Sequence, residues 1–425
     1  MSSPVPERRV VVTGLGAVTS IGFGVTEFLA GLRAGRDAAK PIRSFDTTGF
    51  VHAQGCEITD FEADRFLRNL PRDEFGRASG FAAAAARMAV EDGGMRLDDL
   101  RDARSLVAIG TTDGESRDLE DLVRLEIAGG FENLDPGLAR RVPAGRLSVA
   151  VAYELGLTDV EAVTMTTACA AGNYAVGHGL DAIRNGDVDF ALCGGADALC
   201  LKTLAGFTRL GVVASDHCRP FDRDREGMLP GEGSGVLLLE SLESARRRGA
   251  RVYAEVLGYG LNCDATHAVS PDEESFADCM RLALEDAGIE PGDVDLISAH
   301  GTGTPANDVT EARAINRVFA GDPPPTVAVK SMIGHTMGAA SALASVACAL
   351  AIREGFAPPT INHRETDPEC AVDCVPNAAV DMNVRIVQNN ALAFGGNNAV
   401  VILGIPDDSG RGSRPVPATA PGGER

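Results

Sequence analysis

A cysteine stands where a predicted strand gives way to a predicted helix. Residues 162–167 read as a strand, Cys169 follows at the turn, and small residues open a helix over about 170–184. A thiol at a helix N-terminus experiences the positive end of the helix dipole, which favours the thiolate. Small neighbours would also let a thioester approach the sulfur. From these residues alone, Cys169 is either a nucleophile or a buried packing residue.

A histidine follows a later predicted strand, in a loop of glycine and threonine. His300 comes directly after residues 294–298, in the sequence AHGTGTP. This position would present an imidazole to a cleft, whereas an isolated histidine is more often structural. The hydroxyl groups of Thr302 and Thr304 can form hydrogen bonds to an amide-rich substrate arm.

A lysine and a second histidine follow a third predicted strand. Lys330 comes directly after this strand, and His335 falls at the expected start of a long helix. The positive end of a helix disfavours an imidazolium ion, so we expect His335 to be neutral and to donate a hydrogen bond. Glu311 lies early on the helix after His300 and is expected to pair with Lys330. The alternative for that pair is a solvated ion pair of little consequence.

A glycine-rich loop separates the last two predicted strands. Such a loop can turn backbone amides into a pocket and form half of an oxyanion hole. The alternative is a simple hairpin that needs glycine for its turn. The loop contains Leu392, Ala393, Phe394, Gly395 and Gly396.

All these candidates lie beside strands of a chain in which strands and helices alternate. This alternation predicts an α/β layered fold. The expected strands cover residues 9–13, 106–109, 162–167, 190–193, 235–240, 252–260, 294–298, 327–329, 385–387 and 399–403. The expected helices cover residues 81–91, 170–184, 275–287 and 308–319, and a long one starts near 334. The two halves have a similar order of elements, without a residue-level repeat.

Composition excludes several kinds of partner. The 425 residues carry 39 basic and 60 acidic side chains, a net charge of −21, which argues against nucleic acid because phosphate binding needs clustered Lys and Arg. The most apolar stretch, 337–352, is shorter than the roughly 20 residues that span a membrane, so we expect a buried helix and no membrane segment. The start of the chain has no apolar run typical of a signal peptide, and we expect a cytoplasmic protein.

Cysteine and glycine spacings argue against two other kinds of site. None of the ten cysteines is spaced as CxxC, and no His and Cys cluster has zinc spacing, so we expect free thiols and no metal. The sequence GLGAVTSIG at 14–22 lacks the third glycine of a dinucleotide fingerprint, since Thr19 stands at that position. We expect a tight turn there.

The motifs together resemble those of the β-ketoacyl-acyl carrier protein synthases of the elongating type, found in type II fatty acid and polyketide systems. The resemblance runs over residues 8–400 and includes CRPFDRDREGMLPGEGSGVLLLE at 218–240. The cysteine, HGTGT and KSxxGHxxGA motifs, in this order, are highly specific for the family.

The resemblance implies a fold and a division of the chain. The implied fold is the thiolase-like α/β fold, with two similar halves in a layered αβαβα arrangement, usually in a dimer. We expect an N-terminal half at 1–255 that carries the cysteine and a C-terminal half at 256–406 that carries both histidines. Residues 407–425, rich in Gly, Pro and Ser, are expected to be a disordered tail.

The resemblance also implies a reaction. Cys169 would accept an acyl chain from an acyl carrier protein, with the oxyanion held by the amides of Cys169 and Leu392. His300 and His335 would assist decarboxylation of malonyl carrier protein and stabilise the enolate that attacks the acyl group. Lys330 would orient the histidines.

Glu311 would assist Lys330, and Thr302 and Thr304 would bind pantetheine. No cofactor is implied beyond the phosphopantetheine that the carrier protein brings. The implied partners are an acyl carrier protein and a second subunit, either another copy of the chain or a chain-length-factor-like protein. The basic candidates for carrier docking are Arg65, Arg68, Arg72 and Arg209.

The glycine-rich loop departs from the family pattern. Where the family commonly has Phe-Gly-Phe-Gly-Gly, this chain has Leu392 and Ala393 in the first two positions. The first position resembles the gate over the cysteine, and the second supplies its flexible glycine. Leucine is smaller than phenylalanine, and alanine resists backbone conformations that are open to glycine. We therefore expect altered gating and an altered acyl choice, a polyketide or polyene chain rather than ordinary fatty acids.

Two related classes of protein are the alternatives. A chain-length factor resembles a synthase but lacks the nucleophile, whereas Cys169 and both histidines are present here. A thiolase shares the fold but uses a second cysteine where this chain has His335.

Overall fold

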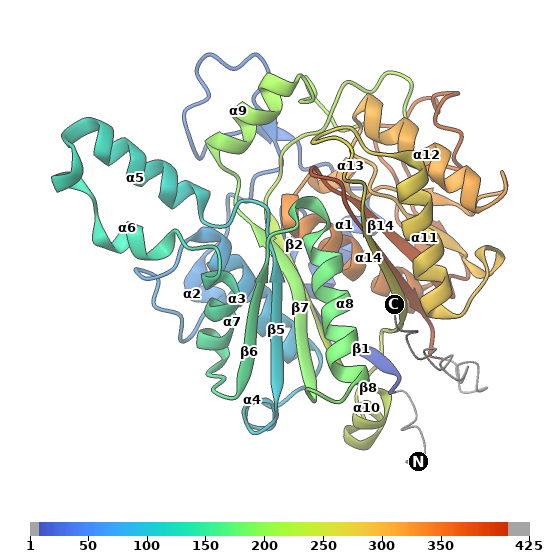
Figure 1. The fold of residues 1–425 in the computed structure, drawn as a ribbon, viewed down its shortest axis with the longest axis horizontal. Helices are drawn as coiled ribbons and strands as arrows, with labels where there is room; N and C mark the ends of the chain where they lie inside the picture. The colour runs from blue at the N-terminus through green and yellow to red at the C-terminus, as the bar shows by residue number, and fades with distance from the viewer. Residues whose placement is uncertain (1–7, 407–425) are drawn as a thin grey trace, which may run out of the picture.

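The computed structural model describes residues 8–406 (Figure 1), so the expected tail at 407–425 lies outside the described residues. One sheet of 11 strands crosses the molecule in the order β11-β10-β14-β15-β9-β1-β8-β7-β5-β6, with β2 paired to β1. The strands of its first part are β1 (Val10–Thr19), β2 (Gly22–Phe23), β5 (Ser105–Gly110), β6 (Val160–Met165), β7 (Phe190–Asp197) and β8 (Gly233–Ser241). The strands of its second part are β9 (Ala254–Cys263), β10 (Leu296–Ser298), β11 (Thr326–Val327), β14 (Ile386–Leu392) and β15 (Asn397–Gly404). Two short hairpins, separate from this sheet, are β3 (Lys40–Pro41) with β4 (Gln54–Gly55) and β12 (Phe356–Ala357) with β13 (Val380–Asp381).

The two parts of the sheet repeat one strand order. The sequence β6-β5-β7-β8-β1 in the first part matches β11-β10-β14-β15-β9 in the second, and β1 and β9 join them as antiparallel neighbours. This repeat confirms the two similar halves that the resemblance implies. Our division between 1–255 and 256–406 remains a proposal, and β9 runs across that boundary.

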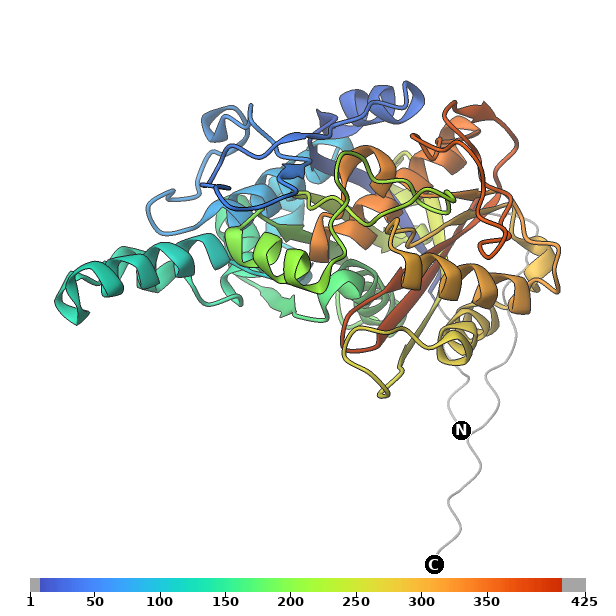
Figure 2. The same ribbon diagram turned by 90° about the horizontal axis from the view of Figure 1, so that it is seen from above.

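The helices form the layers around this bent sheet. Helices α8 (Ala171–Arg184) and α14 (Ala340–Glu354) lie between the two halves and pack on strands of both. Helix α3 (Arg77–Asp92) with α7 (Arg146–Leu155) covers the outer face of the first half. Helix α11 (Glu273–Ala287) with α12 (Pro305–Val318) covers the second half (Figures 1 and 2). The layered thiolase-like arrangement is therefore confirmed.

The remaining helices are short or lie outside these layers. Two of them, α5 and α6, form an arm that projects from the body in both views (Figures 1 and 2). Their bounds are α1 (Gly24–Arg33), α2 (Ala63–Phe66), α4 (Leu97–Arg101), α5 (Ser116–Gly129), α6 (Pro136–Arg141), α9 (Leu201–Leu210), α10 (Leu242–Arg248) and α13 (Lys330–Ile333). Four 3-10 turns are η1 (Phe131–Asn133), η2 (Ala168–Ala170), η3 (Pro291–Asp293) and η4 (Met337–Ala339).

The tight turn expected within 14–22 lies at residues 20–21, between β1 and β2, and not directly after residue 13, because β1 continues to Thr19. A β-bulge between Val12 and Gly14 keeps the strand paired with β8. A Cβ atom on Gly14 would collide with the backbone of α3 at Ala89. Gly14 thus serves close packing of helix on strand, not a turn.

One helix of the described chain, Met337–Glu354, is long and apolar enough to pass a test for a membrane span. Inside the fold 89% of this segment is buried. The prediction of a buried helix at 337–352 is confirmed, since α14 packs between the two halves of the sheet.

A buried amide network ties α8, α14 and β14 together. The Asn173 Nδ2 group on α8 donates to the backbone oxygens of Asn389 (3.0 Å) and Ala399 (3.1 Å). In return, Asn389 Nδ2 donates to Asn173 Oδ1 (3.0 Å) and to Ser345 Oγ on α14 (2.8 Å). Because buried polar groups are costly when unpaired, this network holds the central helices in one register against the sheet.

Replacing Asn173 tests this network. We expect Asn173→Ala to lower the free energy of unfolding by about 3 kcal/mol, because it removes three buried hydrogen bonds to Asn389 and Ala399. Chemical denaturation followed by circular dichroism would measure the shift. Asn185→Ala, at the exposed end of the same helix, should change stability by less than about 0.5 kcal/mol. Equal midpoints for Asn173→Ala and the wild type would contradict the assigned role.

Candidate active site

Cys169 lies in the turn η2, between the end of β6 and the start of α8. The preceding residue, Ala168, has φ +50°, a left-handed conformation that is strained for a residue with a side chain. After this sharp turn the chain no longer follows the direction of β6. Cys169 is 6% exposed, and its side chain lines a cavity. The sequence prediction of a cysteine between strand and helix is confirmed.

Burial raises the pKa of the Cys169 thiol to about 12. The positive charge of Lys330 lowers this pKa, the carboxylates of Asp197 and Asp113 raise it, and the backbone amide of Phe394 lowers it. This direction is opposite to the one expected from a helix N-terminus, and its main cause is the cost of burying a thiolate. The thiol therefore keeps its proton at neutral pH until a substrate reacts.

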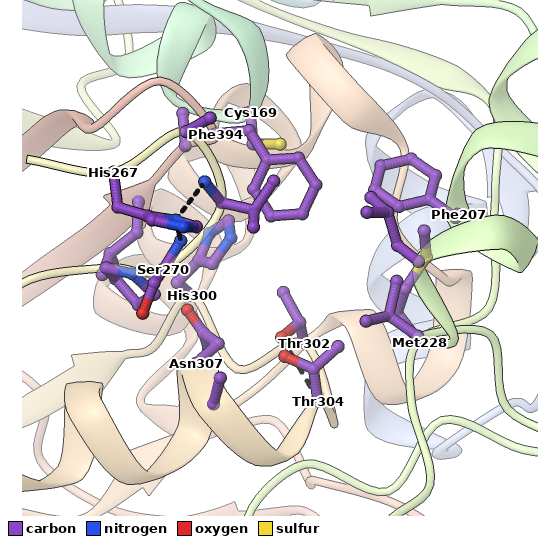
Figure 3. A pocket seen from close by; sticks show the side chains of 18 of the residues that line it. Cys169, Phe207, Met228, His267, Ser270, His300, Thr302, Thr304, Asn307 and Phe394 are labelled. Carbon is purple, nitrogen blue, oxygen red and sulfur yellow. Dashed lines mark hydrogen bonds between the residues drawn. The ribbon is translucent and has the colours of Figure 1, made fainter.

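The glycine-rich loop brings Phe394 to the cysteine. Its backbone N–H group interacts with the Cys169 sulfur, and its ring lies beside Cys169 in Figure 3. The ring is 38% exposed, and its centroid lies 5.6 Å from that of Phe207 on α9. Gly395 and Gly396 both have positive φ, at 86° and 84°, which allows the chain to turn here.

Leu392 occupies a different place from the one expected. It is the last residue of β14, is 3% exposed, and packs in the core of the second half, although it also lines the cavity. The chain turns toward the cysteine only after Leu392 and Ala393. The structure therefore places the Phe394 amide, and not the Leu392 amide, at the Cys169 sulfur.

His300 and His335 face each other across the cavity. Their ring centroids lie 5.5 Å apart with the ring planes nearly perpendicular, at 83°. Burial lowers the pKa of both imidazoles well below the usual value, and the positive charge of Lys330 lowers both further. Both rings are therefore neutral near pH 7 and can each donate one N–H.

His335 does not start a helix. Helix α13 ends at Ile333, and the long helix α14 begins only at Ala340. The side chain of His335 instead caps the turn η4, since its Nδ1 accepts a hydrogen bond from the Met337 amide at 3.1 Å. With Nδ1 as acceptor, the neutral ring carries its proton on Nε2. His335 is therefore the neutral donor that we expected, but burial and Lys330 keep it neutral instead of a helix N-terminus.

Lys330 and Glu311 hold the His300 backbone from two sides. Lys330, which begins α13, donates from Nζ to the His300 oxygen at 2.6 Å, and the same Nζ lies 3.3 Å from His300 Nδ1. The Glu311 carboxylate accepts the backbone N–H groups of His300 (2.7 Å) and Gly301 (2.8 Å). Among the described residues no ion pair joins Lys330 to Glu311, so the expected direct pair is wrong. The carboxylate instead accepts the two backbone amides, because a buried N–H group without a partner is costly.

A second buried carboxylate, which the sequence reasoning missed, holds the rest of this loop. Asp308 accepts the backbone N–H groups of Thr302 (3.1 Å) and Gly303 (3.2 Å) and lies on the same helix as Glu311, three residues earlier. The spacing of three on one helix face was the available signal. The Thr302 and Thr304 hydroxyls are hydrogen-bonded to each other at 2.8 Å, and both residues line the cavity.

The cavity has a volume of about 370 Å³ (Figure 3). It brings together Cys169, both histidines, both threonines and the glycine-rich loop, which come from distant parts of the chain. The sequence reasoning missed further lining residues, namely Phe207, Met228, His267, Ser270 and Asn307. Met228 lies in the segment 218–240 that carries the family resemblance, and the other four lie on helices and loops without a recognisable motif.

One of these missed residues has a fixed tautomer. His267 Nδ1 accepts the backbone N–H groups of Val269 (3.1 Å) and Ser270 (2.9 Å), as Figure 3 shows. The neutral ring must then carry its proton on Nε2. The loop of His267 is also joined to the glycine-rich loop, because the Gly395 amide donates to the Ala268 oxygen at 2.8 Å.

An acidic cluster lies near Cys169 and was also missed. Burial and the neighbouring Asp113 raise the pKa of Asp197, which accepts the Thr111 hydroxyl at 2.6 Å. Asp113 pairs with Lys202 at 2.6 Å and accepts the Thr203 hydroxyl. This cluster raises the pKa of Cys169, whereas Lys330 lowers it.

The four basic candidates for carrier docking fall into two places. Arg209 lies on α9, whose residues Phe207 and Leu210 line the cavity. Arg65, Arg68 and Arg72 lie on or just after α2, which packs on α3, and none of the three lines the cavity. Arg72 pairs with Asp64, and Arg68 donates to backbone oxygens including that of Asp64.

Comparison with protein families agrees with this geometry. The model of the β-ketoacyl synthase N-terminal domain matches residues 7–245, and that of the β-ketoacyl synthase C-terminal domain matches residues 253–364. The chain is 38% identical over 407 residues to 3-oxoacyl-[acyl-carrier-protein] synthase 2 of Synechocystis, covering 93% of this chain and 97% of the relative. It is 39% identical over 407 residues to nodulation protein E of a Rhizobium species, covering 93% and 98%.

Two solved structures share the fold closely. "The ishigamide ketosynthase/chain length factor" is 60% identical with a TM-score of 0.93, covering 94% of this chain and 100% of that one. The type II polyketide complex AntDE:AntF, an acyl carrier protein with its ketosynthase, is 32% identical with a TM-score of 0.86 and the same coverage. The chain therefore belongs to the β-ketoacyl synthase family and is a 3-oxoacyl-acyl carrier protein synthase, an acyltransferase that carries out a condensation.

Proposed function

We propose that the chain is the catalytic ketosynthase of a type II polyketide or polyene pathway and condenses an acyl group on Cys169 with malonyl-acyl carrier protein. The observation that carries the proposal is one cavity that combines Cys169, the Phe394 amide and two neutral imidazoles. The similarity at 60% identity to a ketosynthase/chain length factor, against 38% to a synthase 2, supports the polyketide pathway.

The first half-reaction transfers the acyl group. The Cys169 sulfur attacks the thioester carbonyl of the acyl carrier protein, and the amides of Cys169 and Phe394 hold the oxyanion. The C–S bond to pantetheine breaks, and the pantetheine sulfur leaves with the proton of the cysteine thiol. Thr302 and Thr304, at the wall of the cavity, bind the amide groups of the pantetheine arm.

The second half-reaction forms the carbon–carbon bond. The malonyl carboxylate leaves as carbon dioxide, and its bonding electrons pass to the thioester oxygen as an enolate. His300 and His335 donate their Nε2–H groups to this oxygen, and removing one such donor typically costs about 3 kcal/mol. The enolate carbon attacks the acyl carbonyl, and the Cys169 sulfur leaves and regains a proton. Lys330 lies beside Nδ1 of His300 and keeps the proton of that ring on Nε2.

The surface of the arm and the free edge of the sheet favour the binding of a second subunit of the same fold. The arm exposes an apolar stripe at spacings of four, formed by Leu119, Val123, Ile127 and Phe131. Six of the twelve large exposed hydrophobic side chains lie within residues 119–153, next to β6 at the open end of the sheet. Exposed stripes and open strand edges mark interaction surfaces. The solved ketosynthase/chain length factor favours a chain-length-factor-like partner over a second copy.

Arg209 is the basic residue that we propose for carrier docking, because it lies on α9 beside the cavity. A carrier docked there could insert its arm past Phe207 and Phe394. The net charge of −21 makes local basic residues necessary for binding an acidic carrier.

Loss of Cys169 should abolish acyl transfer. After incubation with acyl carrier protein thioesters, intact-mass spectrometry should show an acyl adduct on the wild type and none on Cys169→Ala. The acyl group that loads best reports the pathway, with a polyketide or polyene chain expected. Absence of any adduct, even after co-expression with the partner subunit, would favour a non-catalytic chain-length-factor-like role.

Lys330 should keep the active-site histidines neutral in weak acid. Their lowered pKa means that both rings stay neutral as the pH falls below 6.5 and gain a proton only at lower pH, where His335 Nδ1 can no longer accept the Met337 amide and the ring loses its position. Lys330→Met removes a positive charge, so the pKa of both rings should rise and malonyl decarboxylation should fail at a higher pH than in the wild type. Histidine NMR would follow the titration. Lys202 pairs with Asp113 and does not contact the histidines, so Lys202→Met should leave the titration of both histidines unchanged. Identical acid limbs for Lys330→Met and the wild type would refute this role.

Charged residues on the arm should prevent subunit association. The double variant Ile127→Asp with Phe131→Asp introduces carboxylates at two positions whose side chains are 81% and 78% exposed, so the protein should still fold. Light scattering of the chain co-expressed with its chain-length-factor-like protein should show a dimer for the wild type and a monomer for the variant. Leu282→Asp on α11, at 44% exposure, is the matched control and should not change the mass. A dimeric arm variant would refute the assigned interface.

A further inference from the structure

Strand β14 carries two buried amide side chains that the proposed reaction does not use. Gln388 and Asn390 are 0% and 2% exposed, and a spacing of two places both on one face of the strand. Amides in the middle of a buried sheet are costly unless they are hydrogen-bonded. Their partners therefore indicate what they do.

A row of hydrogen bonds connects these amides to His300 through the carboxylate of Glu311. Gln388 Nε2 donates to Asn390 Oδ1 at 2.9 Å, and Asn390 Nδ2 donates to Glu311 Oε1 at 3.2 Å. The same Glu311 oxygen accepts the His300 amide at 2.7 Å. Each group in this row is buried, so water does not compete for the bonds.

Glu311 determines which way the Asn390 amide faces. Because a carboxylate only accepts, the Asn390 side chain must turn its NH₂ group toward Glu311, and its Oδ1 then accepts from Gln388. The reverse orientation would set an amide oxygen against a buried carboxylate. The Gln388 donor thus stabilises the Asn390 orientation that Glu311 requires.

Glu311 needs this support because its surroundings disfavour its charge. Burial raises its pKa, the neighbouring Asp308 raises it further, and the N–H groups of Gly301, His300 and Asn390 oppose this. The charged groups that face it are Asp308 on its own helix and Lys330 on α13, which holds the His300 oxygen. The His300 backbone is thereby held between the Lys330 cation and the Glu311 anion. Asn390 on β14 stabilises that anion by a hydrogen bond.

We propose that Asn390 and Gln388 are positioning residues that place His300 for decarboxylation by orienting Glu311. The assignment rests on the proposed role of His300. It also makes β14 a link between the two half-reactions, since the strand continues into the loop that carries the Phe394 amide.

The test separates decarboxylation of malonyl-acyl carrier protein from acyl loading of Cys169. Asn390→Leu, similar in size but without a donor, should slow decarboxylation by roughly tenfold or more and leave loading within about twofold. Asn390→Asp can donate to Glu311 only while it holds a proton. Its decarboxylation should therefore approach the wild-type rate near pH 6 and fall away from it as the pH rises.

Gln388→Met keeps the proposal testable if the Asn390 variants do not fold. This variant removes the donor to Asn390 at similar side-chain volume and should likewise slow decarboxylation while leaving acyl loading nearly unchanged. Thermal melting would show whether the variant is folded. Equal loss of both activities in a folded variant, or wild-type decarboxylation in Asn390→Leu, would overturn the positioning role. A wild-type protein that loads Cys169 but never decarboxylates malonyl-acyl carrier protein would instead refute the proposed function.

Discussion

The close contact between α8 and α14 is the constraint on which the site depends. A Cβ atom on Gly172 would lie 2.5 Å from the Ala342 nitrogen, so only glycine lets the two helix starts approach this closely. Helix α8 begins two residues after Cys169, and α14 begins five residues after His335. The contact therefore brings the cysteine of one half to the histidine of the other. Neither half could supply both groups alone.

Burial then determines the charges that these groups carry. In a medium that disfavours ions, Cys169 keeps its proton, and both imidazoles lose theirs. Lys330 adds to this effect on the histidines and opposes it on the cysteine. The site thus presents neutral donors, which can stabilise a negative oxygen that appears only during the reaction, without reorganising first.

The sequence predicted what depends on local order and missed what depends on contacts across the fold. The cysteine turn, the α/β layers and the gathering of Cys169 with His300 and His335 followed from motifs at strand ends. The pairing of Lys330 with Glu311 was wrong because the choice between a side chain and buried backbone amides is made by tertiary packing. The amide beside the cysteine was assigned to Leu392 because no residue pattern shows where β14 ends and the turn to Phe394 begins.

The polar residues of β14 show how one strand can serve both sides of such a site. Asn389 points toward the central helices and bonds to Asn173, close to the cysteine, whereas Asn390 points the other way and bonds to Glu311, beneath the His300 loop. Alternation along a strand makes this division unavoidable. Two residues further on, Leu392 ends the strand and the chain turns to present the Phe394 amide. A shift of β14 along its neighbours would therefore displace the nucleophile's support, the histidine's support and the oxyanion donor together. Its polar side chains, each with a specific partner, oppose such a shift more strongly than apolar ones could, because a displaced amide would be buried without a hydrogen bond.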